Sequence, residues 1–122
     1  MFKISIITIS YNAEVTIEKT LKSIKSQSYD NIEHIIVDGG SKDNTLEICN
    51  SYPHVSKIIS EPDKGVYDAF NKGIKSATGD VIGFLNADDT FYNENSIQDI
   101  VDAFSNNETD IVYGNLDYVN EE

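Results

Sequence analysis

Two adjacent carboxylates follow an apolar run in the last third of the chain. Residues 81–85 are predicted to form a buried strand, and the sequence Asn-Ala-Asp-Asp follows directly at residues 86–89. Paired carboxylates repel each other unless a cation or a proton lies between them. Their hard oxygen atoms favour Mg²⁺ or Mn²⁺, which bind one or two carboxylates and complete their shell with phosphate oxygens. An ordinary solvated turn that caps the helix near Asn95 is the alternative interpretation.

Two further polar positions follow other predicted strands. Asp38 comes directly before Gly39 and Gly40, so its carboxylate could accept a hydrogen bond from a base or a ribose while the backbone approaches closely. An Asx-turn at Asp38 is equally compatible with the sequence. Tyr11 follows the first predicted strand and could stack on a base. A half-buried tyrosine over the sheet edge is the alternative.

The segments that must position these residues alternate between strand and helix patterns. The predicted strands span residues 4–9, 34–37, 57–60, 81–85 and 110–113. The predicted helices span residues 14–27, 45–51, 66–77 and 97–104, the second capped by Asp43 or Asn44. This alternation predicts an α/β fold, a Rossmann-like open and mainly parallel sheet with helices on both faces. Because ligands bind at the carboxyl ends of such strands, the three polar positions should line one edge.

Length and charge narrow the classes of ligand. The 122 residues suit a single domain, and 21 acidic residues against nine lysines and no arginine leave a net charge of −12. A surface this acidic repels nucleic acid, so we expect no nucleic-acid partner. A phosphate-bearing ligand would need a cation, because the chain offers no guanidinium group.

Several other classes of protein are excluded or disfavoured. The first strand is not followed by a G-x-G-x-x-G fingerprint, and no Walker A sequence occurs. An aspartyl phosphatase would need Asp where Ser10 and Tyr11 stand. The single Cys49 allows no internal disulfide, which fits a reducing compartment, and we expect it to be a buried, inert thiol.

Three ordered motifs resemble glycosyltransferase family 2, whose members are inverting enzymes with a GT-A fold. The motifs are SIITISYN at residues 5–12, IVDGGSKDNT at 36–45 and GDVIGFLNADD at 79–89. The resemblance extends from residue 4 to about residue 119. A further stretch, EPDKGVYDAFNKG at 61–73, resembles the subset that acts in bacterial polysaccharide assembly. His34 and His54 match no role in the family and are expected to be structural or solvated.

The resemblance implies roles for individual residues. Tyr11 and Asp38 would hold the nucleotide base, usually uracil, in a pocket lined by Thr8 and Ser10. Asp88 matches the second acid of the family's D-x-D motif, which binds the metal that bridges the diphosphate. Asn86 replaces the first acid of that motif and, with Ala87, would face the nucleotide. Lys72 could contact the diphosphate or pair with Asp68 one helical turn away.

The resemblance also implies a reaction and its components. A nucleotide-sugar donor such as a UDP-sugar would transfer its sugar, with inversion, to the hydroxyl of a saccharide or lipid-linked saccharide. Mn²⁺ or Mg²⁺ would offset charge on the departing diphosphate. A separate carboxylate would act as general base toward the acceptor. In the family this base lies further along the chain than Glu122.

We therefore expect residues 1–122 to form one domain, the nucleotide-sugar-binding part of such an enzyme, without the C-terminal acceptor-binding half. On its own this part should be inactive in transfer. A non-enzymatic nucleotide-sugar-binding module, or an inactive fragment, is the alternative. No membrane-spanning run is evident, so we expect a cytoplasmic protein that could also bind at the cytoplasmic face of the inner membrane. Without the acceptor-binding half, part of the sheet would be uncovered, and the chain could form a homo-oligomer through it.

Overall fold

The computed structural model describes residues 2–62 and 64–107, and these contain four strands and four helices in alternation. The strands are β1 (Ile4–Ser10), β2 (Ile32–Asp38), β3 (Val55–Ser60) and β4 (Val81–Phe84). The helices are α1 (Ile17–Lys25), α2 (Thr45–Asn50), α3 (Val66–Ser76) and α4 (Ser96–Asn107). The strand predicted at residues 110–113 lies outside the described residues.

The four strands form one parallel sheet in the order β3-β2-β1-β4. The register of β1 against β2 runs from Ile4 beside Ile32 to Ser10 beside Asp38. Since all four strands point the same way, their carboxyl ends share one edge of the sheet. The predicted α/β fold with an open parallel sheet is confirmed.

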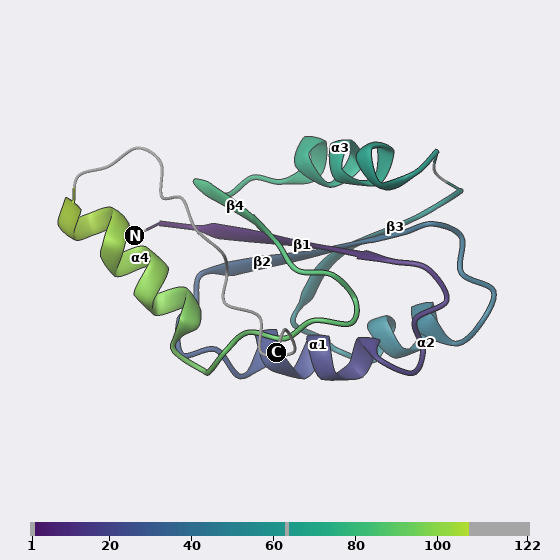
Figure 1. Cartoon of the computed structure of the whole chain (residues 1–122), viewed down its shortest axis with the longest axis horizontal. Coiled ribbons are helices and arrows are strands. Elements are labelled where there is room, and N and C mark those ends of the chain that lie inside the picture. Colours follow the sequence, from purple (N-terminus) through teal and green to yellow (C-terminus); the bar gives the residue numbers. More distant parts are fainter. Residues whose placement is uncertain (1, 63, 108–122) are drawn as a thin grey trace.

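Helices cover both faces of the sheet, as predicted. In Figure 1, α3 lies over one face, and α1 and α2 lie over the other. On the α3 face the buried cluster contains Ile7, Ile35, Val37 and Ala69. On the opposite face it contains Ile17, Leu21, Ile36, Cys49 and Ala87. Gly73 lets α3 approach β1 closely, because a Cβ atom there would lie 2.6 Å from Cγ2 of Ile7.

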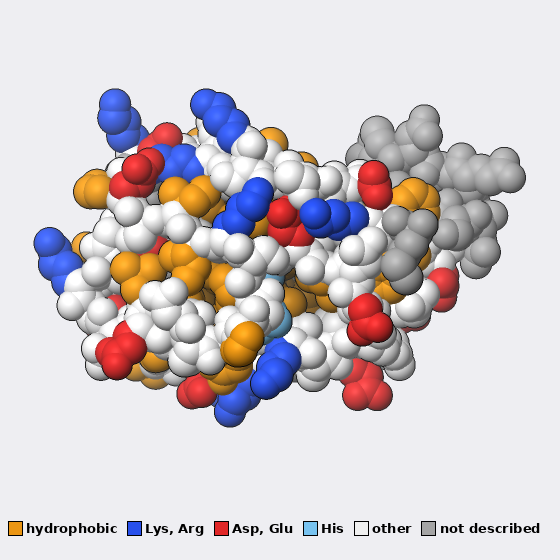
Figure 2. All heavy atoms as spheres, turned by 180° about the vertical axis from the view of Figure 1, so that it is seen from behind, with side chains coloured by type: hydrophobic (Ala, Val, Ile, Leu, Met, Phe, Trp, Pro, Cys, Tyr) orange, Lys and Arg blue, Asp and Glu red, His pale blue; other side chains and the backbone are white. Residues whose placement is uncertain are grey.

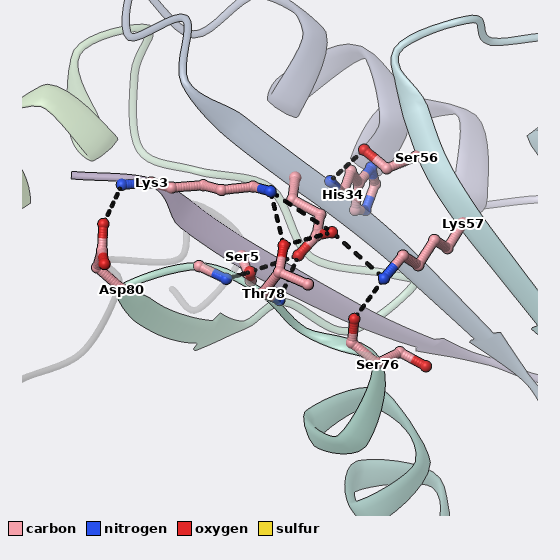
Figure 3. Close-up of polar contacts among 10 residues, drawn as sticks. Lys3, Ser5, His34, Ser56, Lys57, Ser76, Thr78 and Asp80 are labelled. Atoms are coloured by element: carbon pink, nitrogen blue, oxygen red, sulfur yellow. Dashed lines mark hydrogen bonds and ion pairs between the residues drawn. The ribbon is translucent and has the colours of Figure 1, made fainter. Parts of the chain in front are cut away.

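A buried carboxylate ties the amino ends of the strands together. Glu33 accepts hydrogen bonds from the hydroxyl of Ser5 at 2.7 Å and the backbone N–H of Thr78 at 2.9 Å. The ammonium groups of Lys3 and Lys57 lie 3.9 and 3.5 Å from the same carboxylate, and Figure 3 shows both converging on this point. Burial raises the pKa of Glu33, but the hydrogen bonds and Lys3 outweigh it and lower the pKa from 4.5 to about 2.

This network explains why β2 begins earlier than predicted. The predicted strand starts at residue 34 because the acidic Glu33 interrupts the apolar pattern, whereas β2 starts at Ile32. Glu33 is only 5% exposed, and its partners are 28 and 45 residues away in the sequence. A buried charge of this kind needs such partners, and they cannot be recognised from local periodicity.

The first helix is also shorter than predicted, because contacts to a distant segment hold the residues before it in a turn. The apolar pattern predicts a helix over residues 14–27, whereas α1 spans Ile17–Lys25. The N–H groups of Ala13 and Glu14 donate to Thr45 and Asp43, so the chain turns at these residues before the helix begins. For α2, the N-cap residue is Asn44, one of the two predicted, but its side chain makes no capping hydrogen bond. The preceding Asp43 instead accepts hydrogen bonds from the backbone N–H and hydroxyl of Thr45.

His34 and Cys49 are buried, and His54 is half-buried. His34 is fully buried, and its Nε2 lies 2.8 Å from the hydroxyl of Thr8. Its ring stacks on that of His54 with centroids 5.3 Å apart. Burial and the neighbouring His54 lower the pKa of His34 from 6.5 to about 3. Cys49 is also buried, which raises its pKa to about 11, so its thiol is held in the unreactive protonated form.

Charges of both signs are spread over the surface. On the face shown in Figure 2, lysine and acidic side chains are interspersed and do not gather into a basic stripe. A stripe of that kind is the usual footprint of a nucleic-acid-binding surface.

Candidate functional site

A cleft of about 500 Å³ lies where the carboxyl ends of β1 and β4 meet the beginnings of α1 and α3. Its lining residues are Ile9, Tyr11, Asn12, Ala13, Thr16, Val66, Phe70, Asn86, Ala87 and Asp88. Tyr11 is 59% exposed, so its ring is open to a ligand rather than half-buried. The structure therefore brings together four of the predicted site residues: Tyr11, Asn86, Ala87 and Asp88.

The turn after β4 presents Asp88 to this cleft. The backbone N–H of Asp89 donates to the carbonyl of Asn86 at 3.0 Å and closes the turn. Ala87 is 7% exposed and packs in the apolar cluster beside α1, whereas Asn86 and Asp88 are exposed. Just before α4, the N–H of Asn95 donates to the side chain of Asn93. In the first turn of α4, the N–H of Ile97 donates to the side chain of Gln27.

The donor atoms at this turn suit a hard divalent cation that shares its shell with a ligand. Within residues 2–62 and 64–107, no group of three or more His, Cys, Asp or Glu side chains forms a ready-made metal site. Among the described residues that line the cleft, Asp88 offers a carboxylate, and Asn86 in the same turn offers a side-chain amide. Mg²⁺ typically binds through one or two carboxylates together with phosphate oxygens and water. The residues present therefore fit such an ion as part of a shared site.

The loops after β1 and β2 are locked together by reciprocal hydrogen bonds. The backbone N–H of Asn12 donates to the hydroxyl of Ser41 at 2.7 Å, and the N–H of Lys42 donates to the side-chain oxygen of Asn12 at 2.9 Å. The carboxylate of Glu14 accepts from the N–H of Asn44 at 3.0 Å. Asn12 has a φ of +48°, a left-handed conformation that Asn tolerates better than most residues. This turn directs the chain from Tyr11 into α1.

Asp38 lies beneath these loops, and the cleft lining does not include it. Its side chain is fully buried, and its carboxylate accepts hydrogen bonds from three hydroxyl and two backbone N–H groups. The bond from the N–H of Gly40, two residues on, forms the Asx-turn that the sequence left open. Burial raises the pKa of Asp38, but bonds from Ser41, Ser10 and Ser60 outweigh it and hold the pKa below 3.8.

Thr8 and Ser10 share the buried position of Asp38. Ser10 donates its hydroxyl proton to Asp38 at 2.8 Å, and Thr8 contacts His34. Both side chains are 3% exposed or less, and neither lines the cleft. The roles of Thr8, Ser10 and Asp38 toward a base remain predictions.

Lys72 also lies outside the cleft lining. Its ammonium group is 3.1 Å from Glu61 and 3.4 Å from Asp68, so the pairing with Asp68 that the sequence suggested is present. Partial desolvation lowers the pKa of Lys72, but the hydrogen bond that it donates to Glu61 and the charge of Asp68 outweigh this effect and raise the pKa above 10.5. Contact with a diphosphate remains a prediction, since it would compete with two ion pairs.

A comparison with protein families shows which family the chain belongs to. The family model for glycosyl transferase family 2 matches residues 5–122. The chain belongs to glycosyl transferase family 2. This confirms the resemblance read from the three motifs.

The chain is also similar to individual proteins of the family. It is 37% identical over 117 residues to a PGL/p-HBAD biosynthesis glycosyltransferase of Mycobacterium bovis, an alignment that covers 92% of this chain and 46% of the relative. The family 2 chain therefore spans about half the length of that relative. None of its described helices is long and apolar enough to cross a membrane.

Two solved structures show the same GT-A fold. Staphylococcus aureus TarS 1–349, in complex with UDP-GlcNAc, superposes with a TM-score of 0.82 at 26% identity, over 87% of the family 2 chain and 32% of TarS 1–349. Glucosyl-3-phosphoglycerate synthase from Mycobacterium tuberculosis, in complex with Mn²⁺, UDP and glucosyl-3-phosphoglycerate, superposes with a TM-score of 0.67 at 23% identity. That alignment covers 84% of the family 2 chain and 39% of the synthase, and it bears on the fold alone.

Proposed function

We propose that this chain binds a nucleotide-sugar donor, with UDP as the nucleotide and Mn²⁺ or Mg²⁺ at Asp88. It would be the donor-binding domain of an enzyme that transfers the sugar, with inversion, to an acceptor hydroxyl. The observation that carries this proposal is the single cleft lined by both Tyr11 and the Asn86–Asp88 turn. An aromatic ring for a base and a carboxylate for a diphosphate-bound cation are thus available to one ligand.

The need for a cation follows from the backbone groups near the cleft. The N–H groups of Asn12, Ala13 and Glu14 donate to Ser41, Thr45 and Asp43. In dinucleotide-binding folds the backbone of the turn between the first strand and the first helix approaches the phosphates, but in this chain these three N–H groups of that turn already have partners. The chain has no arginine, and Lys72 is held by two acids. A divalent ion at Asp88 would therefore supply the positive charge that offsets the departing diphosphate.

The base would stack on Tyr11, because an exposed aromatic face at the mouth of the cleft accepts a planar ring. The carboxylate of Asp38, with Thr8 and Ser10 beside it, would accept a hydrogen bond from uracil. For this, the loop at residues 39–41 would have to move so that one of its hydrogen bonds to Asp38 is replaced by a bond from the base. Asn86 and Ala87 would contact the nucleotide next to the metal. Lys72 would contact the phosphate groups of the nucleotide. The UDP-GlcNAc bound to TarS supports a UDP-sugar as the donor.

The general base for the acceptor would come from beyond the described residues. Among them, Asp88 is the only carboxylate that lines the cleft, and it cannot serve the metal and the acceptor proton together. The acceptor would be a saccharide or a lipid-linked saccharide in the assembly of a bacterial surface polysaccharide. Such an enzyme would work in the cytoplasm, at the inner face of the membrane, where its lipid-linked acceptor is held, and as a homo-oligomer.

Thermal melts with and without metal test the proposal. UDP should raise the melting temperature in the presence of Mn²⁺, since a ligand that binds only the folded state stabilises it. With a chelator it should have little effect. Asp88→Ala should lose this metal-dependent shift. Asp99→Ala is the matched control, because it removes the same charge from an exposed site on α4. An unchanged UDP shift in Asp88→Ala would contradict the metal assignment.

A further inference from the structure

A column of polar side chains on α1 holds the segment that follows β4. Thr20 donates its hydroxyl proton to the carbonyl of Asp89 at 2.6 Å. One turn on, the hydroxyl of Ser23 accepts from the N–H of Phe91 at 2.7 Å. Gln27, just past the helix, donates to the carbonyl of Asn93 at 2.8 Å and accepts from the N–H of Ile97 at 3.0 Å. These positions recur at the spacing of one helix face.

Thr20 is the member of this column next to the candidate metal-binding turn. Its side chain is fully buried, so the hydroxyl cannot exchange its partner for water. The carbonyl oxygens of Asp89 and Asn86 lie 2.6 and 3.5 Å from it. A hydroxyl has one proton to donate, so the shorter contact is the hydrogen bond. The carbonyl of Asn86 accepts instead from the N–H of Asp89.

The turn that carries Asp88 is therefore fixed on both sides of that residue. Before it, Ala87 is buried in the cluster with Ile17 and Leu21 of α1. After it, the carbonyl of Asp89 is held by Thr20. Asp88 itself is exposed in the cleft. Both attachments come from the same helix, so α1 sets the position of the backbone from which the Asp88 carboxylate extends.

We propose that Thr20 is a positioning residue for metal binding by Asp88, a role that rests on the proposed function. Without the Thr20 hydroxyl, the carbonyl of Asp89 loses its buried donor, and the turn loses its attachment to α1 on the Asp89 side. The carboxylate then samples more positions, and a cation shared with a diphosphate binds less tightly. Residues that orient a metal ligand in this way typically change metal affinity by about 10- to 100-fold when they are replaced.

The experiment measures the dissociation constant of Mn²⁺ by electron paramagnetic resonance, with UDP at saturation, in four forms of the chain. Thr20→Val keeps the shape of the side chain and removes the donor. Thr20→Ser keeps the donor. Ser23→Ala is the matched control, since it removes a hydrogen bond from the same helix to the same segment, at Phe91. A thermal melt of each form reports the general loss of stability.

We expect Thr20→Val to weaken Mn²⁺ binding by about tenfold, with Thr20→Ser and Ser23→Ala close to the parent chain. Equal Mn²⁺ affinity in Thr20→Val and Ser23→Ala, with both melting temperatures lowered, would show a structural role alone and overturn the proposal. If Thr20→Val does not fold, Thr20→Ser and Thr20→Ala form the decisive pair, because they differ only in the hydroxyl. Failure of the parent chain to bind Mn²⁺ with UDP would overturn the proposed function and this inference together.

Discussion

The side-chain oxygen of Asn12 accepts a hydrogen bond from the backbone N–H of Lys42 at 2.9 Å. The two residues belong to different loops, and the bond holds Asn12 in a left-handed turn with φ of +48°. Tyr11 is the preceding residue and lines the cleft. The direction of its ring into the cleft therefore depends on a contact made 30 residues further along the chain.

Replacement of Asn12 should separate the backbone turn from the contact to Lys42. Asn12→Gly keeps access to the left-handed conformation but removes the acceptor. Asn12→Asp keeps both. We expect Asn12→Gly to raise the amide hydrogen exchange rate of Lys42 and to weaken binding of uridine by roughly fivefold, since a lost neutral hydrogen bond costs about 1 kcal/mol. Uridine is the appropriate probe because its neutrality avoids repulsion by the new carboxylate of Asn12→Asp.

A comparison with Ser41→Ala shows whether Asn12 acts through the loop or by direct contact with the ligand. Ser41 accepts from the N–H of Asn12 but does not line the cleft. If the loop lock matters, Ser41→Ala should weaken uridine binding as well, and the double variant should lose less than the sum of the two. Normal binding by Ser41→Ala would instead indicate direct contact by Asn12.

Tyr11 and Asp38 should respond differently to removal, although both are predicted to bind the base. Tyr11→Ala truncates a side chain that is 59% exposed, so it should weaken UDP binding by about tenfold, as expected for the loss of one stacking contact, with little change in stability. Asp38→Ala leaves several buried donors without their acceptor. It should lower the free energy of unfolding by about 3 kcal/mol or more.

Urea unfolding and UDP titration of both variants check this contrast. Asp38→Ala should also weaken UDP binding, by roughly one to two decades, if its carboxylate reaches the base. A destabilised but folded Asp38→Ala that binds UDP like the parent chain would leave Asp38 as a loop residue only. Strong destabilisation of Tyr11→Ala would contradict the exposed position of its ring.

Stability should fall below neutral pH because of the two histidines. The folded state lowers the pKa of His34 from 6.5 to about 3. His54 is also shifted downward, by burial and by Lys25. Between pH 6.5 and 3, His34 is therefore protonated in the unfolded chain but not in the folded chain. The free energy of unfolding decreases as the pH falls through this window, and the contribution of His34 does not change with pH above it. At pH 5, His34 alone should cost about 2 kcal/mol relative to pH 7.5.

Urea unfolding midpoints between pH 7.5 and 5 measure this loss. His34→Gln cannot take up the proton and should retain only the smaller slope that His54 contributes. Glu33 adds a separate loss at lower pH, since its folded pKa of about 2 lies below the ordinary 4.5, and stability from its ionised form disappears below about pH 4.5. Parallel profiles for His34→Gln and the parent chain would exclude His34 as the source.

The 122-residue chain should bind a donor without catalysing efficient transfer. Among the described residues, the cleft contains one carboxylate, Asp88, and no second acid to accept the proton of an acceptor hydroxyl. We expect at most slow, metal-dependent hydrolysis of a UDP-sugar, measured as released UDP, with no increase when saccharide acceptors are added. Asp88→Ala should abolish the hydrolysis. Rapid acceptor-dependent transfer by the purified chain would show that it contains the general base.

The sequence by itself determined the alternation of strands and helices, and with it the position of several site residues. The apolar runs before Tyr11 and Asn86 are local patterns of buried strands, and the parallel arrangement follows from the helices between them. These two facts are enough to predict that Tyr11 and Asp88 share one edge of the sheet. The ordered motifs then identified the family, which needs no coordinates.

Only the tertiary structure decided which polar side chains face the cleft and which support it from behind. Asp38 and Tyr11 occupy equivalent places in the sequence, since both follow a strand, but Asp38 is buried under hydroxyl and N–H donors whereas Tyr11 is exposed. The roles of Thr20 and Glu33 cannot be recognised from the sequence, because their partners are distant along the chain. Thr20 lies 69 residues from Asp89, and Glu33 lies 28 and 45 residues from Ser5 and Thr78. Burial and hydrogen bonding of a polar group depend on what the fold places beside it, and the residue's type and immediate neighbours do not contain that information.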